Sequence, residues 1–135
     1  MVRIAIDYLG DLRCRAVHTA SGASLETAAP LDNGGKGDSF SPTDLAATAL
    51  GTCVATVLGL HAARHSIDLR GMRVTVDKHM TATGPRRIAR LDVVVELPLP
   101  RDSASDALER AARTCPVQRS LLPGIEIRLR FVWRA

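Results

Sequence analysis

Aromatic residues are scarce in this sequence, at 3% of 135 residues. Proteins that bind RNA or single-stranded DNA usually interleave basic side chains with stacking aromatic rings. Here the 18 lysines and arginines give a formal charge of +4, but they are spread along the whole chain. We therefore expect no nucleic-acid partner, and we interpret the basic balance as a solvated surface.

A signal peptide and a membrane-spanning run are also lacking. Apolar and charged residues alternate from Val2 to Asp7, without the roughly 7–15-residue apolar run that a signal peptide requires. The most apolar stretch, Leu45–Leu60, is interrupted by threonines and glycines and is shorter than the ~20 residues that span a bilayer. We expect a cytoplasmic protein without a membrane partner, in which this stretch forms a buried helix.

Metal and nucleotide motifs are missing as well. The three cysteines have no C-x-x-C spacing, and His61 and His65 are not part of an H-E-x-x-H pattern. The glycine cluster at 34–37 lacks the spacing of a phosphate-binding loop. An odd number of cysteines without a secretion signal favours free thiols over a disulfide framework. We expect no metal and no cofactor.

What is present is a regular succession of alternating and helical patterns. The order βββ-α-ββ-α-β predicts one α+β domain over residues 1–135, with antiparallel sheets and a long central helix. The expected strands cover residues 2–8, 13–19, 24–28, 72–80, 91–97 and 125–133, and the expected helices cover 42–65 and 102–115.

The start of the long helix has a strong signature. Ser41 is the expected N-cap, Pro42 takes the first helical position, and Asp44 completes a capping box. The preceding residues, 30–39, have three glycines and no periodicity, which predicts a mobile surface loop. The helix itself is too apolar to be covered by one small sheet. We therefore expect an obligate dimer in which a second subunit covers the rest.

The cysteines are the candidate reactive groups, although a free cysteine in an apolar setting is often an inert core residue. Cys53 stands in the middle of the long helix, where Ala or Leu would pack as well. We expect Cys115 at the C-terminal end of the second helix, immediately before Pro116, and a helix C-terminus disfavours a thiolate. This favours Cys53 as the attacking thiol and Cys115 as the second thiol. The spacing alone does not say whether the two meet, and Cys14 receives no role.

Two segments carry a resemblance to a known family. Residues 41–55, SPTDLAATALGTCVA, resemble the first cysteine motif of the OsmC/Ohr family (osmotically inducible protein C and organic hydroperoxide resistance), and residues 115–121, CPVQRSL, resemble the second. The resemblance implies an intertwined homodimer that reduces alkyl or fatty hydroperoxides in an antioxidant response to oxidative stress. Cys53 would attack the peroxide, Cys115 would resolve the product as a disulfide, and a dithiol such as a lipoylated protein would restore both thiols. No metal, haem or flavin is implied.

The chain departs from the family pattern at one position. In the peroxidase branches a glutamate follows the motif proline and holds an arginine against the first cysteine, but here that position is Thr43. Our hypothesis is that Arg15, on the second strand, replaces the usual arginine. The departure leaves two alternatives open. One is a non-enzymatic dimer that binds a small hydrophobic or electrophilic ligand at the subunit interface, and the other is a purely structural dimer.

Overall fold

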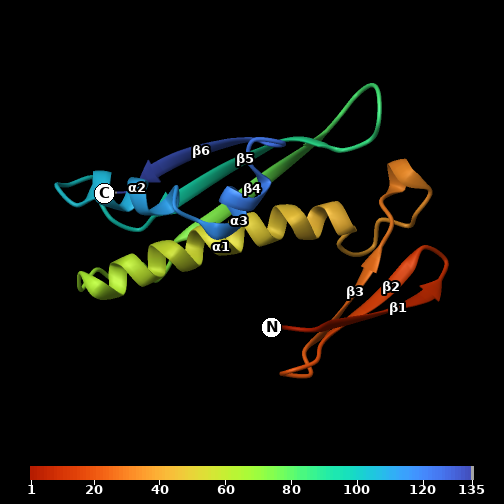
Figure 1. The fold of residues 1–135 in the computed structure, drawn as a ribbon. Helices are drawn as coiled ribbons and strands as arrows, with labels where there is room; N and C mark the ends of the chain where they lie inside the picture. The colour runs from red at the N-terminus through yellow and green to blue at the C-terminus, as the bar shows by residue number, and fades with distance from the viewer. Residues whose placement is uncertain (135) are drawn as a thin grey trace. The chain divides into compact units, whose positions relative to one another are not determined.

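The computed structural model describes residues 1–134, which form two compact units, one from Met1 to Ala46 and one that begins at Ala47. The elements follow the predicted order, with the short helices η1 and α3 added (Figure 1). Their bounds are β1 Ile4–Gly10, β2 Arg13–His18, β3 Ser24–Ala28, η1 Leu31–Asn33, α1 Pro42–Arg64, β4 Arg73–Met80, β5 Ile88–Leu97, α2 Ser105–Ala112, α3 Pro116–Leu121 and β6 Glu126–Trp133.

The first unit is built on an antiparallel sheet in the order β1-β2-β3. A tight hairpin joins β1 to β2, and its two central residues, Asp11 and Leu12, have φ angles of 53° and 60°. Positive φ at both central positions matches the twist of the flanking strands, which is why such turns are favoured in tight hairpins.

The loop at residues 30–39 contains the short helix η1 and several backbone hydrogen bonds. The backbone N–H groups of Asn33 and Gly35 donate to the Pro30 carbonyl, and Gly37 donates to the Ala29 carbonyl. A Cβ atom at Gly35 would lie 1.8 Å from the Ala29 oxygen, so only glycine permits this approach. The glycines therefore allow the loop to fold back against the end of β3.

Helix α1 begins as the sequence predicts. The Ser41 backbone N–H donates to Asp44 Oδ2 at 2.9 Å, and the Asp44 N–H donates back to Ser41 Oγ at 3.1 Å. Over an 18-residue window the helix has a mean hydropathy of 1.6, and 33% of that window is buried. By length and composition alone this helix could cross a membrane, a test that the core helix of a soluble protein also passes.

The second unit packs helices on one face of the sheet β4-β5-β6 (Figure 1). Helix α1 lies close to β4, because a Cβ atom built at Gly51 would come within 2.9 Å of Val76 Cγ2. Helix α2 contacts the end of β6, where the Trp133 indole N–H donates to Glu109 at 3.3 Å. Alternate residues of β5 face these helices and are at most 1% exposed: Leu91, Val93, Val95 and Leu97.

One strand pairing differs from the antiparallel pattern. Strand β6 runs parallel to β5, with Val93 opposite Leu129. Parallel neighbours require a crossover connection, and the chain between β5 and β6 supplies one through α2 and α3. The crossover carries Cys115 across the same face of the sheet on which α1 lies.

Candidate active site

Cys53 lies in the middle of α1 and is partly exposed. Its neighbours Leu50 and Val54 are fully buried and turn toward the core. The thiol therefore stands at the edge of the buried face of α1, where a small molecule can reach it from solvent.

Cys115 is fully buried, and its place in the fold corrects our prediction of a helix C-terminus. Helix α2 ends at Ala112, and Cys115 is the N-cap of α3, with Pro116 in the first turn. The Gln118 backbone N–H donates to Cys115 Sγ at 3.4 Å. Pro116 starts the next helix, because its fixed φ and missing N–H suit a first helical position.

The structure brings the two predicted cysteines together although they are 62 residues apart in the sequence. Burial raises the pKa of the Cys115 thiol above its ordinary value, and a hydrogen bond with Cys53 raises it further. The backbone N–H of Gln118 opposes this rise more weakly. Cys115 is thus held as a neutral thiol in contact with Cys53, and burial replaces the helix C-terminus as the reason that it is not the first nucleophile.

Gln118 is a site residue that the sequence reasoning missed. The residue is only 9% exposed, and its Oε1 atom is buried without a hydrogen-bond partner among the described residues. A buried acceptor of this kind is rare in folded proteins unless a ligand or a water molecule bonds to it. Its position in the segment CPVQ, three residues after Cys115, was the signal available in the sequence.

The arginines of β2 differ in their surroundings. Arg13 donates to Asp38 at 2.7 Å and lies 3.7 Å from Glu26, and its hydrogen bond lowers the pKa of Asp38. Arg15 is exposed and forms no ion pair within residues 1–134. Our hypothesis from the sequence named Arg15, but Asp38 and Glu26 form their ion pairs with Arg13. The pairing of Arg13 with Asp38 depends on the folded glycine loop, which periodicity does not reveal.

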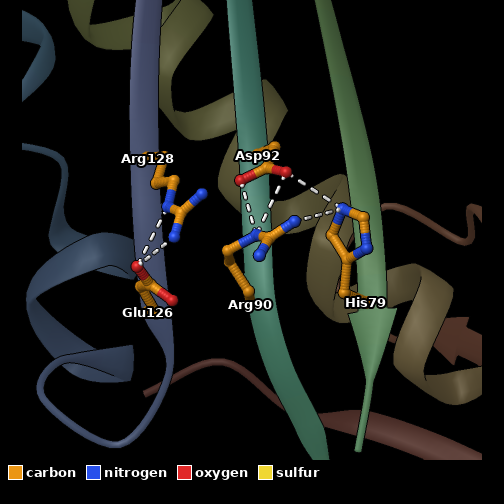
Figure 2. A network of polar contacts seen from close by, with 5 residues as sticks. All are labelled: His79, Arg90, Asp92, Glu126 and Arg128. Carbon is orange, nitrogen blue, oxygen red and sulfur yellow. Dashed lines mark hydrogen bonds and ion pairs between the residues drawn. The ribbon is translucent and has the colours of Figure 1, made fainter.

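A second polar cluster lies on the opposite face of the β4-β5-β6 sheet (Figure 2). Arg90 donates to both oxygens of Asp92, and His79 Nε2 lies 2.9 Å from the same carboxylate. Partial burial raises the pKa of Asp92, but Arg90 and His79 outweigh it and hold that pKa below its ordinary value. Arg128 pairs with Glu126 on the neighbouring strand. In the described part of the chain, no cysteine thiol and no serine or threonine hydroxyl bonds to His79. We therefore interpret the cluster as a structural ion-pair network.

A metal centre is not formed by the residues that the structure describes. No group of three His, Cys, Asp or Glu side chains gathers at one place in them. The site brings together two thiols, one partly exposed and one buried.

Comparisons with known proteins show the family of the chain. The family model for OsmC-like proteins matches residues 35–130. The chain belongs to the OsmC-like family. No curated protein matches this OsmC-like chain.

Solved structures resemble this OsmC-like chain over nearly its full length. A Psychrobacter arcticus 273-4 protein, assigned to the osmotic stress induced and detoxification response, is 37% identical, with 97% of this chain and 96% of that chain covered and a TM-score of 0.91. An organic hydroperoxide resistance protein OsmC from Legionella pneumophila is 18% identical, with coverage of 98% and 96% and a TM-score of 0.79. One from Elizabethkingia anophelis is 18% identical, with coverage of 99% and 96% and a TM-score of 0.80. The predicted OsmC/Ohr fold is confirmed.

Proposed function

We propose that this OsmC-like protein is a thiol peroxidase that reduces organic hydroperoxides with Cys53 and Cys115. The observation that carries the proposal is the contact between a partly exposed cysteine and a fully buried one. A peroxide reaches the first thiol from solvent, whereas the second is shielded from peroxide and placed to react only with its neighbour. This asymmetry separates an attacking thiol from a resolving thiol.

The reaction then has two balanced steps. The Cys53 thiolate attacks the distal oxygen of the hydroperoxide, the O–O bond breaks, and the alkoxide leaves as an alcohol after taking up a proton. Cys53 becomes a sulfenic acid. The sulfur of Cys115 attacks that of Cys53, an S–S bond forms, and water leaves with the Cys115 proton. One hydroperoxide is reduced for each pair of thiols oxidised.

A dithiol closes the cycle in this proposal. Exchange with a dithiol returns both cysteines to thiols and leaves the reductant as a cyclic disulfide. We expect a lipoylated protein in this role, in the cytoplasm, where free thiols such as those of this chain persist. Steady-state turnover with dihydrolipoamide and with glutathione tests this point, because only the dithiol should sustain the cycle.

The decisive experiment is intact-mass spectrometry after one equivalent of cumene hydroperoxide. We expect the loss of two hydrogens, located by peptide mapping to a Cys53–Cys115 bridge. Cys14→Ser is the matched control and should behave as the parent does. In Cys115→Ser the sulfenic acid on Cys53 should persist and react with dimedone. An unchanged mass in the parent protein would refute the proposal.

Gln118 adds an acceptor to the proposed site. Its buried Oε1 atom offers a hydrogen bond to the O–H of the bound hydroperoxide or of the sulfenic acid. Gln118→Leu should therefore slow peroxide reduction while leaving the rate of Cys53 alkylation by iodoacetamide unchanged. If both rates fall together, Gln118 acts only through the local fold.

Activation of Cys53 by an arginine remains a prediction. The residue we propose from the sequence is Arg15, which is exposed and has no ion pair in the described chain. Arg15→Met should lower the rate constant for the reaction of Cys53 with peroxide. Arg13→Met is the matched comparison, because Arg13 is already bound by Asp38. A slow Arg13 variant with a normal Arg15 variant would transfer the role to Arg13.

One observation favours the non-enzymatic alternative. The Asp44 carboxylate accepts the Ser41 backbone N–H in the helix cap, and Thr43 Oγ1 lies 3.2 Å from Ser41 Oγ, so this segment serves the cap where the family has its glutamate. An OsmC-like dimer that binds a small hydrophobic or electrophilic ligand would need no such glutamate. Ligand binding without disulfide formation in the mass experiment would support this reading.

A homodimer is the assembly that we propose. In the first unit Ile4, Ile6 and Tyr8 point to one side of β1 and are 51%, 65% and 66% exposed. In the second unit the Thr52 and Thr56 hydroxyls donate to carbonyls of α1 itself, so the exposed side of that helix presents mainly methyl groups. A second copy would bury both faces. Sedimentation as a monomer at micromolar concentration would exclude it.

A further inference from the structure

Four exposed arginines lie around the turn that carries Cys115. Arg110 belongs to α2, Arg113 directly follows that helix, and Arg119 belongs to α3. Arg64, the last residue of α1, lines a surface groove together with Arg110. None of the four forms an ion pair within residues 1–134. We call these four residues the arginine patch.

The charge of the patch is not compensated by its surroundings. The connection from residue 110 to residue 125 contains three of the arginines and neither an aspartate nor a glutamate. The nearest carboxylates of α2, those of Asp106 and Glu109, each accept a hydrogen bond of 2.6 Å from Arg101. Clustered like charges repel one another and destabilise a compact fold. The patch therefore has a cost to stability that binding of an anionic partner would offset.

The state of His61 agrees with an uncompensated positive field at this place. His61 lines the same groove as Arg64 and Arg110. Partial burial lowers the pKa of its ring below 6.5, and the charges of His65, Arg64 and Arg110 lower it further. The two arginines therefore act together on one part of the surface.

The patch adjoins the cysteine pair. Pro116, which directly follows Cys115, lines the groove, and so does Val57, one helical turn after Cys53. Cys115 itself is fully buried, so Cys53 is the sulfur that a reductant reaches in a disulfide between them. At 1.5 Å per residue, Arg64 lies about 16 Å along the helix axis from Cys53. A protein seated on the patch could therefore extend a dithiol to Cys53 on a flexible side-chain arm.

We infer that the arginine patch docks an acidic face of the protein that carries the reducing dithiol. This inference rests on the proposed function, because the dithiol is needed to reopen the Cys53–Cys115 disulfide. Exchange would pass two electrons and two protons from the dithiol to the cysteines and leave a cyclic disulfide on the partner.

An acidic protein fits the patch better than other polyanions do. Guanidinium groups bind carboxylates through paired hydrogen bonds, and complementary charge speeds the encounter of two proteins. A single-stranded nucleic acid would need stacking aromatic rings beside the arginines. The chain has few aromatic residues, and the ring of Phe131 is already covered by Arg113, whose guanidinium lies 5.8 Å from the ring centroid.

Reduction by two matched peptides tests the inference. The protein is first oxidised with diamide, which forms a disulfide without any hydroperoxide. Each synthetic peptide carries one dihydrolipoyl-lysine, flanked by glutamates in one peptide and by glutamines in the other. At low ionic strength we expect the glutamate peptide to reduce the parent protein about tenfold faster, and high salt should remove most of this preference.

Two double variants show whether the patch causes the preference. R110Q/R119Q removes one charge on each side of Cys115 and should lose the preference for the glutamate peptide. R73Q/R130Q removes two charges from the opposite face of the sheet and should keep it. Because the preference compares two peptides on one protein, a general loss of folded protein cancels. If both double variants lose the preference equally, net charge and not the patch causes it, and the inference is overturned.

Binding of the peptides in their disulfide form separates this inference from the proposed function. Fluorescence anisotropy should show that the parent binds the glutamate peptide more tightly than R110Q/R119Q does. If this holds but cumene hydroperoxide forms no disulfide, the docking surface stands and the peroxidase proposal fails. If cumene hydroperoxide forms the disulfide while the parent binds and reacts with both peptides equally, the peroxidase stands and the docking surface is overturned. An oligonucleotide that displaces the glutamate peptide at lower concentration than a free glutamate peptide does would also overturn it in favour of a nucleic-acid site.

Discussion

Replacing Gly51 by alanine tests the contact that places Cys53, because Gly51 lies close against β4. An added Cβ atom would meet Val76 Cγ2 at 2.9 Å and Val74 Cγ1 at 3.6 Å. A valine methyl group cannot swing away as the end of a long side chain does. Overpacking of this kind costs about 1–3 kcal/mol, whereas alanine gains about 1 kcal/mol over glycine in a helix interior. We expect Gly51→Ala to lower the free energy of unfolding by up to ~2 kcal/mol.

A double-mutant cycle with Val76→Ala isolates the contact from helix propensity. Removing the valine methyl groups makes room for the new Cβ atom, so Gly51→Ala should become neutral or stabilising in that background. The coupling free energy should be about 1–3 kcal/mol, measured by urea denaturation at one fixed protein concentration. A coupling near zero would show that α1 does not pack on β4 at Gly51, and with it the placement of Cys53 would fail.

Three further outcomes follow from the site and the first hairpin. The alkylation of Cys115 by iodoacetamide should have its pH midpoint above the ordinary thiol value. Cys53→Ala should lower that midpoint, because it removes the hydrogen bond with Cys53 that raises the pKa of Cys115. The His61 ring should titrate below 6.5 by NMR, so its contribution to stability falls as pH drops below 6.5, and Arg110→Gln should raise its pKa. Leu12→Asn should raise the free energy of unfolding by up to ~1 kcal/mol in thermal melts, because leucine at φ 60° is strained and asparagine tolerates that conformation.

The elements that the sequence predicts well are those whose signals are local. The capping box at Ser41 and Asp44 fixed the start of α1, and its hydrogen bonds form as expected. Strict alternation placed the six strands to within a few residues. These features depend on contacts between residues only a few positions apart, so periodicity and capping chemistry suffice to predict them.

The end of the second helix shows where local reasoning fails. The apolar spacing continues from Ala104 to Cys115 as if one helix ran through, but α2 stops at Ala112 and a new helix begins at Pro116. Both arrangements bury Cys115, so the hydrophobic pattern does not distinguish them. The turn between the two helices is set by the crossover to a parallel β6, a pairing between residues more than 30 positions apart.

The same crossover brings Cys53 and Cys115 together, and no local sequence pattern predicts that contact. Cys53 is carried by a straight helix that packs on β4, and Cys115 is carried by the turn between α2 and α3, which must cross the helical face of the sheet to reach β6. Burial under this connection raises the pKa of Cys115, while Cys53, at the edge of the helix face, stays accessible. In our proposal, the cysteine that the crossover covers is the resolving thiol, and the cysteine left accessible is the attacking thiol. If the crossover covered Cys53 instead of Cys115, the two cysteines would exchange these roles.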